Sequence, residues 1–190
     1  MPIEEKKLVA DCIAGDLNAS RRLYDLYAGK LFAICLRYAG DRMEAEDVLQ
    51  DAFIKIFENI KQFRSEGSLE GWLKRVVVNT SIKQYHKHNY KYLYPVINIE
   101  NVEDDIQDTI TDDEHLPDYS EDELYEMIHS LAPRYRMVFS LYAIEEHSHK
   151  EIAQMLGISE GTSKSQLARA RIALQNMIEE KQKKTKYAAI

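Results

Sequence analysis

Apolar residues recur with a helical period along most of this chain, and the pattern predicts an almost entirely helical protein. In the first half, helices are expected over residues 4–14, 18–38 and 41–60, and a fourth helix of about twenty residues starts at Ser68. Four shorter helices are expected between residues 120 and 180. The second helix is expected to turn six residues inward: Leu23, Leu26, Tyr27, Leu31, Ile34 and Cys35. The predicted fold class is therefore all-α.

The helical pattern breaks in the middle of the chain. Residues 92–119 lack convincing periodicity, contain two prolines and are dense in acid, which is typical of a linker. The sequence thus predicts two small helical domains, residues 1–91 and 120–190, joined by an acidic flexible linker, residues 92–119.

Charge is segregated along the chain, and this changes what the net charge implies. The net charge over all 190 residues is −7. Residues 100–126 alone hold 13 acids and no Lys or Arg, and the remainder has 25 bases against 19 acids. The acidic total therefore does not exclude binding to nucleic acid.

The last two expected helices have the layout of a helix-turn-helix. Ser148 and Glu151 predict a capping box, Gly157 a left-handed helix end, and Ser159 the cap of the final helix. The final helix should bury Leu167, Ala170, Leu174 and Ile178. The motif also carries eight short polar or basic side chains, which are suited to contacts with base edges and phosphates. They are Lys150, Ser159, Thr162, Lys164, Ser165, Gln166, Arg169 and Arg171. An ordinary helix pair with a solvated polar face is the alternative interpretation.

The third expected helix has an acidic face opposite its core face. Asp41 and Glu44 predict a capping box at its start, and five residues form the predicted core face: Leu49, Phe53, Ile56, Phe57 and Ile60. The opposite side carries Asp47, Asp51, Ile54 and Glu58, with Glu44 and Gln50 beside them. A solvated face explains the charges. An exposed Ile54 within them also suits a docking site for a basic, partly apolar protein surface.

The fourth expected helix is basic and aromatic. Residues 71–99 contain five bases and no acid. Basic side chains follow phosphates, and aromatic side chains stack on unpaired bases, so this helix suits single-stranded nucleic acid. Trp72 lies in an apolar run with Leu73 and Val76, which favours a core position over a stacking platform.

Other classes of function find little support in the sequence. Cys12 and Cys35 lack CxxC spacing, which is typical of buried thiols in a reducing cytoplasm. There is no apolar run long enough to span a membrane and no signal-peptide pattern, so we expect a cytoplasmic protein without membrane insertion. The pairs His86/His88 and His147/His149 have poor metal-ligand spacing, and no phosphate loop or nucleophile elbow is present. We expect no catalytic residue, no metal and no cofactor.

These pieces, in this order, resemble the sigma factors of RNA polymerase, specifically their extracytoplasmic-function (ECF) branch. The segments that carry the resemblance are residues 45–53, 71–76 with Asn79, 131–136, 151–153 and 159–171. The match extends over about residues 10–89 and 120–176 and leaves the linker unmatched. The combination is specific, whereas any single segment is not.

The resemblance implies three binding surfaces. The acidic helix would bind the clamp helices of the largest subunit of core RNA polymerase through Asp47, Gln50 and Asp51, to which the face analysis adds Ile54. The non-template strand of the −10 promoter element would be captured by seven residues: Phe63, Arg64, Ser65, Arg75, Asn79, Lys83 and His86. The final helix would read the −35 element as duplex DNA. An anti-sigma factor is a further implied partner.

Two positions depart from the family pattern. The family usually has an apolar residue where this chain has Ser163, and often Arg where it has Gln166. Ser163 is expected on the core side at a cost to packing, and Gln166 is expected to change the preferred base. A stand-alone helix-turn-helix regulator is the alternative function, although it leaves the acidic helix and the basic fourth helix without a role.

Overall fold

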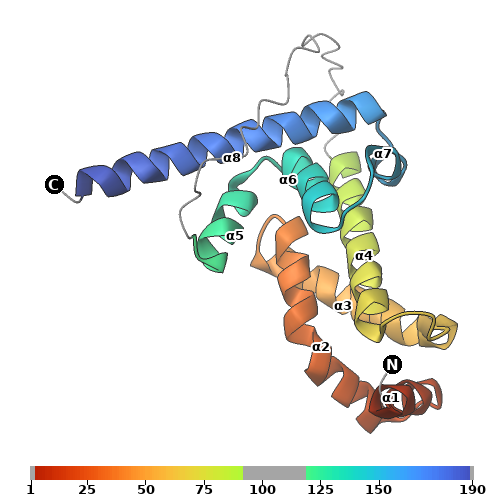
Figure 1. The fold of residues 1–190 in the computed structure, drawn as a ribbon. Coiled ribbons are helices and arrows are strands. Elements are labelled where there is room, and N and C mark those ends of the chain that lie inside the picture. The colour runs from red at the N-terminus through yellow and green to blue at the C-terminus, as the bar shows by residue number, and fades with distance from the viewer. Residues whose placement is uncertain (1–2, 92–118, 189–190) are drawn as a thin grey trace. The chain divides into compact units, whose positions relative to one another are not determined.

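The structure is a computed structural model that describes residues 3–91 and 119–188 (Figure 1). Over these ranges the chain is helical and contains no strand, which confirms the predicted all-α class. The chain divides into two compact units, unit 1 from Met1 to Asn89 and unit 2 from Tyr90 to Ile190. Residues 92–118 of the predicted linker lie outside the described residues.

Unit 1 is built from four α-helices and one short 3-10 helix. They are α1 (Ile3–Ile13), α2 (Leu17–Tyr38), α3 (Arg42–Asn59), η1 (Ile60–Gln62) and α4 (Leu69–Lys91). Asp16 caps α2, and its carboxylate accepts a hydrogen bond from the Asn18 N–H at 2.7 Å. Ser68 starts α4 as expected, because its hydroxyl accepts from the Gly71 N–H at 3.0 Å. The first three predicted helices are thus present with ends within one residue of the prediction, and α4 has 23 residues where about twenty were expected.

The start of α3 differs from the predicted capping box. Asp41 accepts a hydrogen bond from the Glu44 N–H at 2.8 Å, as expected of an N-cap. The Glu44 carboxylate, however, accepts from the Gly40 N–H at 2.6 Å instead of from Asp41. The prediction of Asp41 as the backbone donor to Glu44 was therefore wrong by one residue. Because the donor is Gly40, this hydrogen bond also holds the residue that precedes the N-cap.

The core of unit 1 lies between α2, α3 and α4. Leu23 and Leu31 of α2, Ile56 of α3, and Leu69 and Leu73 of α4 are completely buried. Two predicted core residues were wrong: Leu26 is 54% exposed and Phe57 is 36% exposed. Each lies about 110° from the centre of the buried stripe of its helix, just beyond the width that a packed face covers.

Unit 2 contains α5 (Glu121–Ser130), α6 (Pro133–Phe139), a π-helical turn η2 (Ser140–Ile144), α7 (His149–Leu156) and α8 (Glu160–Ala188). Its core includes Met137, Val138, Leu141 and Ile152, onto which α8 packs with Leu167 and Ala170. Leu174 and Ile178, also predicted as core, are half-buried.

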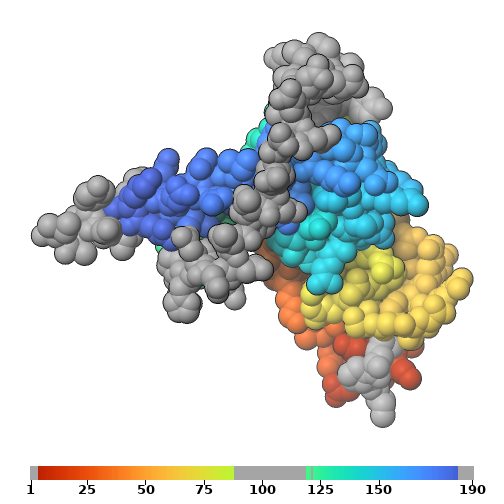
Figure 2. Space-filling view, turned by 45° about the horizontal axis from the view of Figure 1, so that its top comes forward, coloured from red at the N-terminus to blue at the C-terminus, as the bar shows by residue number. Residues whose placement is uncertain are grey.

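The last helix is longer than the sequence pattern predicts. The expected helix ends near residue 180, whereas α8 has 29 residues and runs to Ala188. It forms a continuous rod in the ribbon view (Figure 1), and in the space-filling view its blue surface is seen beside the cyan surface of the preceding helices of unit 2 (Figure 2). Its later part is held to α5, because Lys181 pairs with Glu123 at 3.4 Å and the Met177 sulfur lies 3.2 Å from the Ser130 hydroxyl oxygen. Within the described part of the chain, no helix has both the length and the apolar character needed to cross a membrane.

Candidate polymerase and promoter interfaces

The predicted helix-turn-helix is present as α7, a turn at Gly157 and α8. A complete capping box starts α7: the Glu151 N–H donates to the Ser148 hydroxyl at 3.3 Å, and the Ser148 N–H donates to the Glu151 carboxylate at 2.8 Å. These hydrogen bonds from Ser148 hold the pKa of Glu151 below its ordinary value. Gly157 has a φ of +66°, the left-handed conformation that glycine adopts without strain. The Ser159 hydroxyl then accepts from the Thr162 N–H at 3.0 Å and caps α8.

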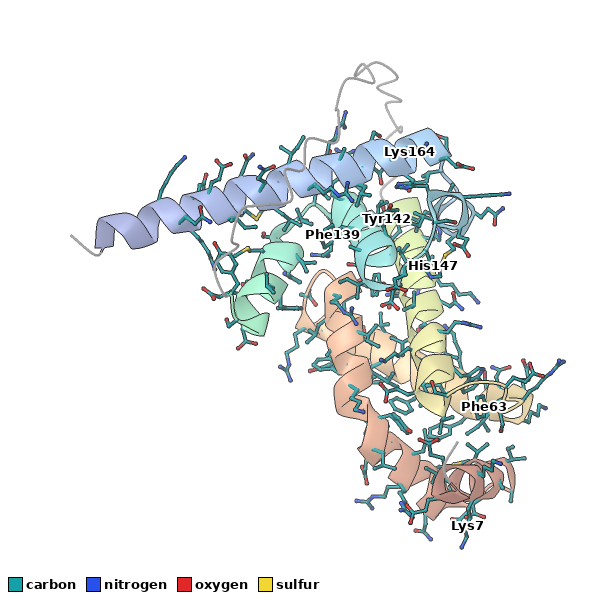
Figure 3. The ribbon with its side chains drawn as sticks, viewed as in Figure 1. Lys7, Phe63, Phe139, Tyr142, His147 and Lys164 are labelled. Carbon is teal, nitrogen blue, oxygen red and sulfur yellow. The ribbon has the colours of Figure 1, made fainter. Side chains whose placement is uncertain are left out.

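The helix-turn-helix carries the residues predicted to read duplex DNA. Lys150, Ser159, Lys164 and Ser165 are exposed. Thr162, Gln166, Arg169 and Arg171 are half-buried. Figure 3 labels Lys164 near the start of α8 and Tyr142 on the adjoining η2 turn. The structure thus places all eight side chains on one motif, with small hydroxyl residues beside longer basic ones.

Three of the small residues are held by local hydrogen bonds. The Thr162 and Ser159 hydroxyls lie 2.9 Å apart, and the Ser165 hydroxyl donates to the Thr162 carbonyl at 3.0 Å. These contacts hold the hydroxyls close to the helix backbone, so that short side chains cover the first turns of α8. A slim helix can approach base edges closely in the major groove.

Arg169 contacts a residue that the sequence analysis gave no role. The hydroxyl of Tyr135 in α6 is hydrogen-bonded by Arg169, and it accepts from Arg134 at 3.2 Å. Burial raises the pKa of Tyr135, but the hydrogen bonds and charges of Arg169 and Arg134 outweigh it and hold that pKa below its ordinary value. The Arg134 guanidinium also lies 4.9 Å from the Tyr135 ring centre. Tyr135 therefore helps to fix a candidate base-reading side chain.

Ser163 lies in the core, as its position in the pattern predicts. It is completely buried, and its hydroxyl lies 2.9 Å from Nδ1 of His149 in α7. The cost of burying its hydroxyl is small, because a buried hydroxyl with a hydrogen-bond partner avoids most of its desolvation penalty. The sequence pattern does not predict this contact, because the two residues are 14 positions apart and lie on different helices.

The acidic face of α3 is exposed and also carries apolar side chains. Asp47, Gln50 and Asp51 are exposed, and Ile54 is 56% exposed. Met43, 73% exposed, lies on the same side three turns before Ile54. Sequence reasoning missed Met43, although its spacing of eleven residues from Ile54 was a readable signal. The face therefore has two apolar side chains among carboxylates.

The predicted basic face of α4 is a single stripe. Arg75, Asn79, Lys83 and His86 are spaced four, four and three residues apart, which aligns them along one side of the helix. Arg75, Asn79 and Lys83 are exposed, and His86 is half-buried. On the other side of α4, Thr80 and Ser81 are buried, and their hydroxyls donate to the carbonyls of Val76 and Val77.

The loop before α4 holds the remaining predicted −10 residues. Phe63, labelled in Figure 3, packs on Trp72 with ring centres 5.7 Å apart, and both side chains are half-buried. Trp72 is thus neither fully in the core nor a free platform. Arg64 and Ser65 are exposed, and Ser65 has a φ of +58°. A serine in this left-handed conformation is strained, a property often found in binding loops.

Other candidate chemistry is sparse in the described residues. Both cysteines are buried thiols, and burial raises the pKa of Cys12 and raises that of Cys35 to about 12. Such thiols are poor nucleophiles at neutral pH. Across residues 3–91 and 119–188, no cluster of three His, Cys, Asp or Glu side chains could hold a metal ion.

The two units match two parts of one protein family. The sigma-70 region 2 family model matches residues 23–91, and the sigma-70 region 4 model matches residues 121–174. The ECF RNA polymerase sigma factor SigW of Bacillus subtilis is 31% identical over 180 residues, which cover 91% of this chain and 96% of that protein. The ECF RNA polymerase sigma-E factor of Escherichia coli is 30% identical over 186 residues, 93% of this chain and 95% of that protein.

The chain therefore belongs to the ECF RNA polymerase sigma factors, as its resemblance predicted. Members of this family are transcription initiation factors and not catalytic enzymes. Among solved structures, RpoE from Bartonella quintana in complex with the anti-sigma factor NepR has a TM-score of 0.49 and 22% identity, with 84% of this chain and 96% of that chain covered. CnrH in complex with the cytosolic domain of CnrY has a TM-score of 0.46 and 20% identity, with coverages of 91% and 96%.

Proposed function

We propose that this sigma factor binds core RNA polymerase through the outer face of α3 and directs initiation through α4 and α8. Promoter-directed initiation is the function of its family, and region 2 and region 4 fall on its two units. The observation that best supports the division of labour is chemical. The exposed face of α3 is acidic and partly apolar, whereas the exposed faces of α4 and α8 are basic and polar.

The polymerase site on α3 consists of Asp47, Gln50, Asp51 and Ile54. Carboxylates beside an exposed Ile suit a partner surface that is basic at its rim and apolar at its centre. The resemblance assigns that partner to the clamp helices of the largest polymerase subunit. Met43, on the same side of α3, extends the apolar part of this site.

The −10 site combines the strained loop with the stripe on α4. Arg75 and Lys83 supply positive charge, Asn79 supplies an amide that can hydrogen-bond a base edge, and His86 continues the stripe. Phe63, Arg64 and Ser65 line the loop that precedes them. Charge together with aromatic rings is the combination that holds unpaired strands.

The −35 site consists of residues of the helix-turn-helix, most of them on α8. Gln166 and Arg169 are the candidate readers of bases, because Gln pairs with adenine and Arg with guanine through two hydrogen bonds. Lys150, Lys164 and Arg171 are candidate phosphate contacts that set the position of the helix on the duplex. Ser159, Thr162 and Ser165 complete the surface at the start of α8.

The proposed function also concerns catalysis, cellular location and partners. The chain itself catalyses no reaction and needs no cofactor or metal, and it works in the cytoplasm. An anti-sigma factor is an expected partner, by resemblance to the family. The domains of the proposal are residues 1–91 for polymerase and −10 binding, residues 92–119 as linker, and residues 120–190 for −35 binding.

Transcription from a pool of random upstream sequences, with purified core polymerase, tests this function. Transcripts that appear only when the protein is added, and that share two spaced motifs, are the expected result. Binding to one duplex motif without transcription would instead favour a stand-alone helix-turn-helix regulator. Copurification with core polymerase separates these two functions independently, since only a sigma factor is expected to remain bound to the enzyme.

A further inference from the structure

A chain of contacts within unit 2 connects the core of the helix-turn-helix to a candidate phosphate contact. It starts at Ser163, a completely buried residue of α8 whose hydroxyl lies 2.9 Å from Nδ1 of His149. His149 is the first residue of α7. The two helices of the motif are thus joined by a polar contact at the point where apolar packing would otherwise be expected.

The imidazole of His149 has a second contact through its ring face. It stacks on Tyr142 of η2, with ring centres 4.6 Å apart and an interplanar angle of 22°. The Arg171 guanidinium, one of the candidate phosphate contacts of α8, lies over the same Tyr142 ring at 5.9 Å from its centre. Ring stacking limits how Tyr142 can turn, and a cation–π contact limits where Arg171 can point.

The charges around His149 favour its neutral form. Lys164 and Arg171 of α8 face it with positive charge, and Glu160 of α8 faces it with negative charge. Burial is the largest cause that lowers the pKa of His149, and Lys164 and Arg171 lower it further, against the smaller opposing effect of Glu160. A neutral imidazole can share the hydrogen bond with Ser163 and stack on Tyr142 without adding a third cation to this cluster.

We propose that His149 is a positioning residue for promoter recognition, which holds α8 through Ser163 and holds Arg171 at a phosphate of the −35 duplex through Tyr142. The proposal rests on the proposed role of α8 in binding the −35 element. It assigns a function to the serine that departs from the family pattern. It also assigns one to a histidine that makes none of the DNA contacts proposed above.

The dependence of DNA affinity on salt measures this role directly. Each phosphate contact contributes roughly 0.9 to the slope of log affinity against log salt concentration. The full-length wild-type protein first selects a duplex motif from a random pool, and its affinity for that duplex is measured across a series of KCl concentrations. The same measurement is made on H149A, R171A and the double variant H149A/R171A, after their helix content and thermal melting have been checked.

We expect R171A and H149A each to lower the salt slope by about one contact, and the double variant to lower it no further than R171A alone. H149F keeps an aromatic ring for Tyr142, and we expect it to restore the wild-type slope, above all when S163V replaces the lost hydrogen bond by apolar packing. H147F, a histidine substitution two residues away, is the matched control and should leave affinity and slope unchanged.

Several results would overturn the inference. If H149A keeps the wild-type slope, or if its effect adds to that of R171A, then His149 does not act through Arg171. A loss of affinity at constant slope would mark His149 as a purely structural residue. A wild-type protein that selects no duplex motif would overturn the proposed −35 function itself, and the inference with it, which separates that failure from the others.

Discussion

The ammonium group of Lys55 in α3 donates a hydrogen bond to the hydroxyl of Thr80 in α4 at 3.1 Å. Thr80 is buried, and its own hydroxyl hydrogen is directed to the Val76 carbonyl at 2.8 Å. Burial lowers the pKa of Lys55, and the nearby charge of Lys83 lowers it further. This contact joins the helix with the proposed polymerase site to the helix with the proposed −10 site, behind both exposed faces.

Replacement of Thr80 by valine keeps the shape of the side chain and removes its hydroxyl. Lys55 then loses its acceptor in a partly buried position, so we expect T80V to lower the free energy of unfolding by about 1–3 kcal/mol. Urea denaturation followed by circular dichroism measures the change. T80S keeps the hydroxyl and should lose less, and equal losses in the two variants would show that the hydrogen bond to Lys55 contributes little.

The sequence pattern was sufficient to predict the helices and most of the core, because both depend on local periodicity. It failed where a residue lies at the margin of a buried stripe. Leu26 and Phe57 are apolar, and their exposure depends on how far the neighbouring helices wrap around α2 and α3. The end of α8 was also missed, since its continuation depends on contacts with α5, such as the ion pair between Lys181 and Glu123.

The candidate sites could be predicted as surfaces but not as networks. The side of α3 that holds Asp51 follows from helical spacing alone. The contact between Ser163 and His149 does not, because it depends on the angle between α7 and α8. The same is true of Tyr135, which reaches Arg169 only because α6 packs against α8.

Charge reversal on α3 tests the proposed polymerase site. Asp51 is exposed, so D51K should leave the protein folded, with the helix content of the wild type. It should weaken binding to core polymerase, because a positive charge would then face a basic partner surface, and an unfavourable pair of this kind costs up to several kcal/mol. Titration of core polymerase with a fluorescently labelled sigma factor gives the affinity.

The control for this experiment carries the same change of charge elsewhere in unit 1. Asp25 on α2 is exposed and lies 4.0 Å from Arg21 in a surface ion pair. Such a pair contributes little to stability, so D25K should fold normally and bind polymerase as the wild type does. If D51K and D25K weaken binding equally, net charge and not a site on α3 governs the interaction.

Two substitutions in unit 2 distinguish a base contact from its support. R169A should cost on the order of 1–3 kcal/mol at one base pair of the −35 element and relax the preference there. Y135F removes the hydroxyl that contacts Arg169 but keeps the ring under Arg134. We expect it to relax the preference at the same base pair to a smaller degree, as measured by binding to duplexes that differ at single positions. A loss spread evenly over all duplexes would mark Arg169 as a phosphate contact.

The pKa of His149 predicts how the stability of the protein depends on pH. Its folded-state pKa lies below the ordinary value of 6.5, chiefly through burial and then through Lys164 and Arg171. As the pH falls below about 6.5, the imidazole of residue 149 binds a proton in the unfolded chain but not yet in the folded protein. The contribution of His149 to stability is therefore fully present above about pH 6.5 and is lost as the pH falls through the folded-state pKa. Between about pH 7.5 and pH 5, wild-type protein should therefore lose more unfolding free energy than H149F, because carboxylates and the other histidines titrate in both and cancel in the difference. Urea denaturation at the two pH values measures it, and parallel losses in the two proteins would show that the imidazole accepts its proton as readily in the folded state as in the unfolded chain.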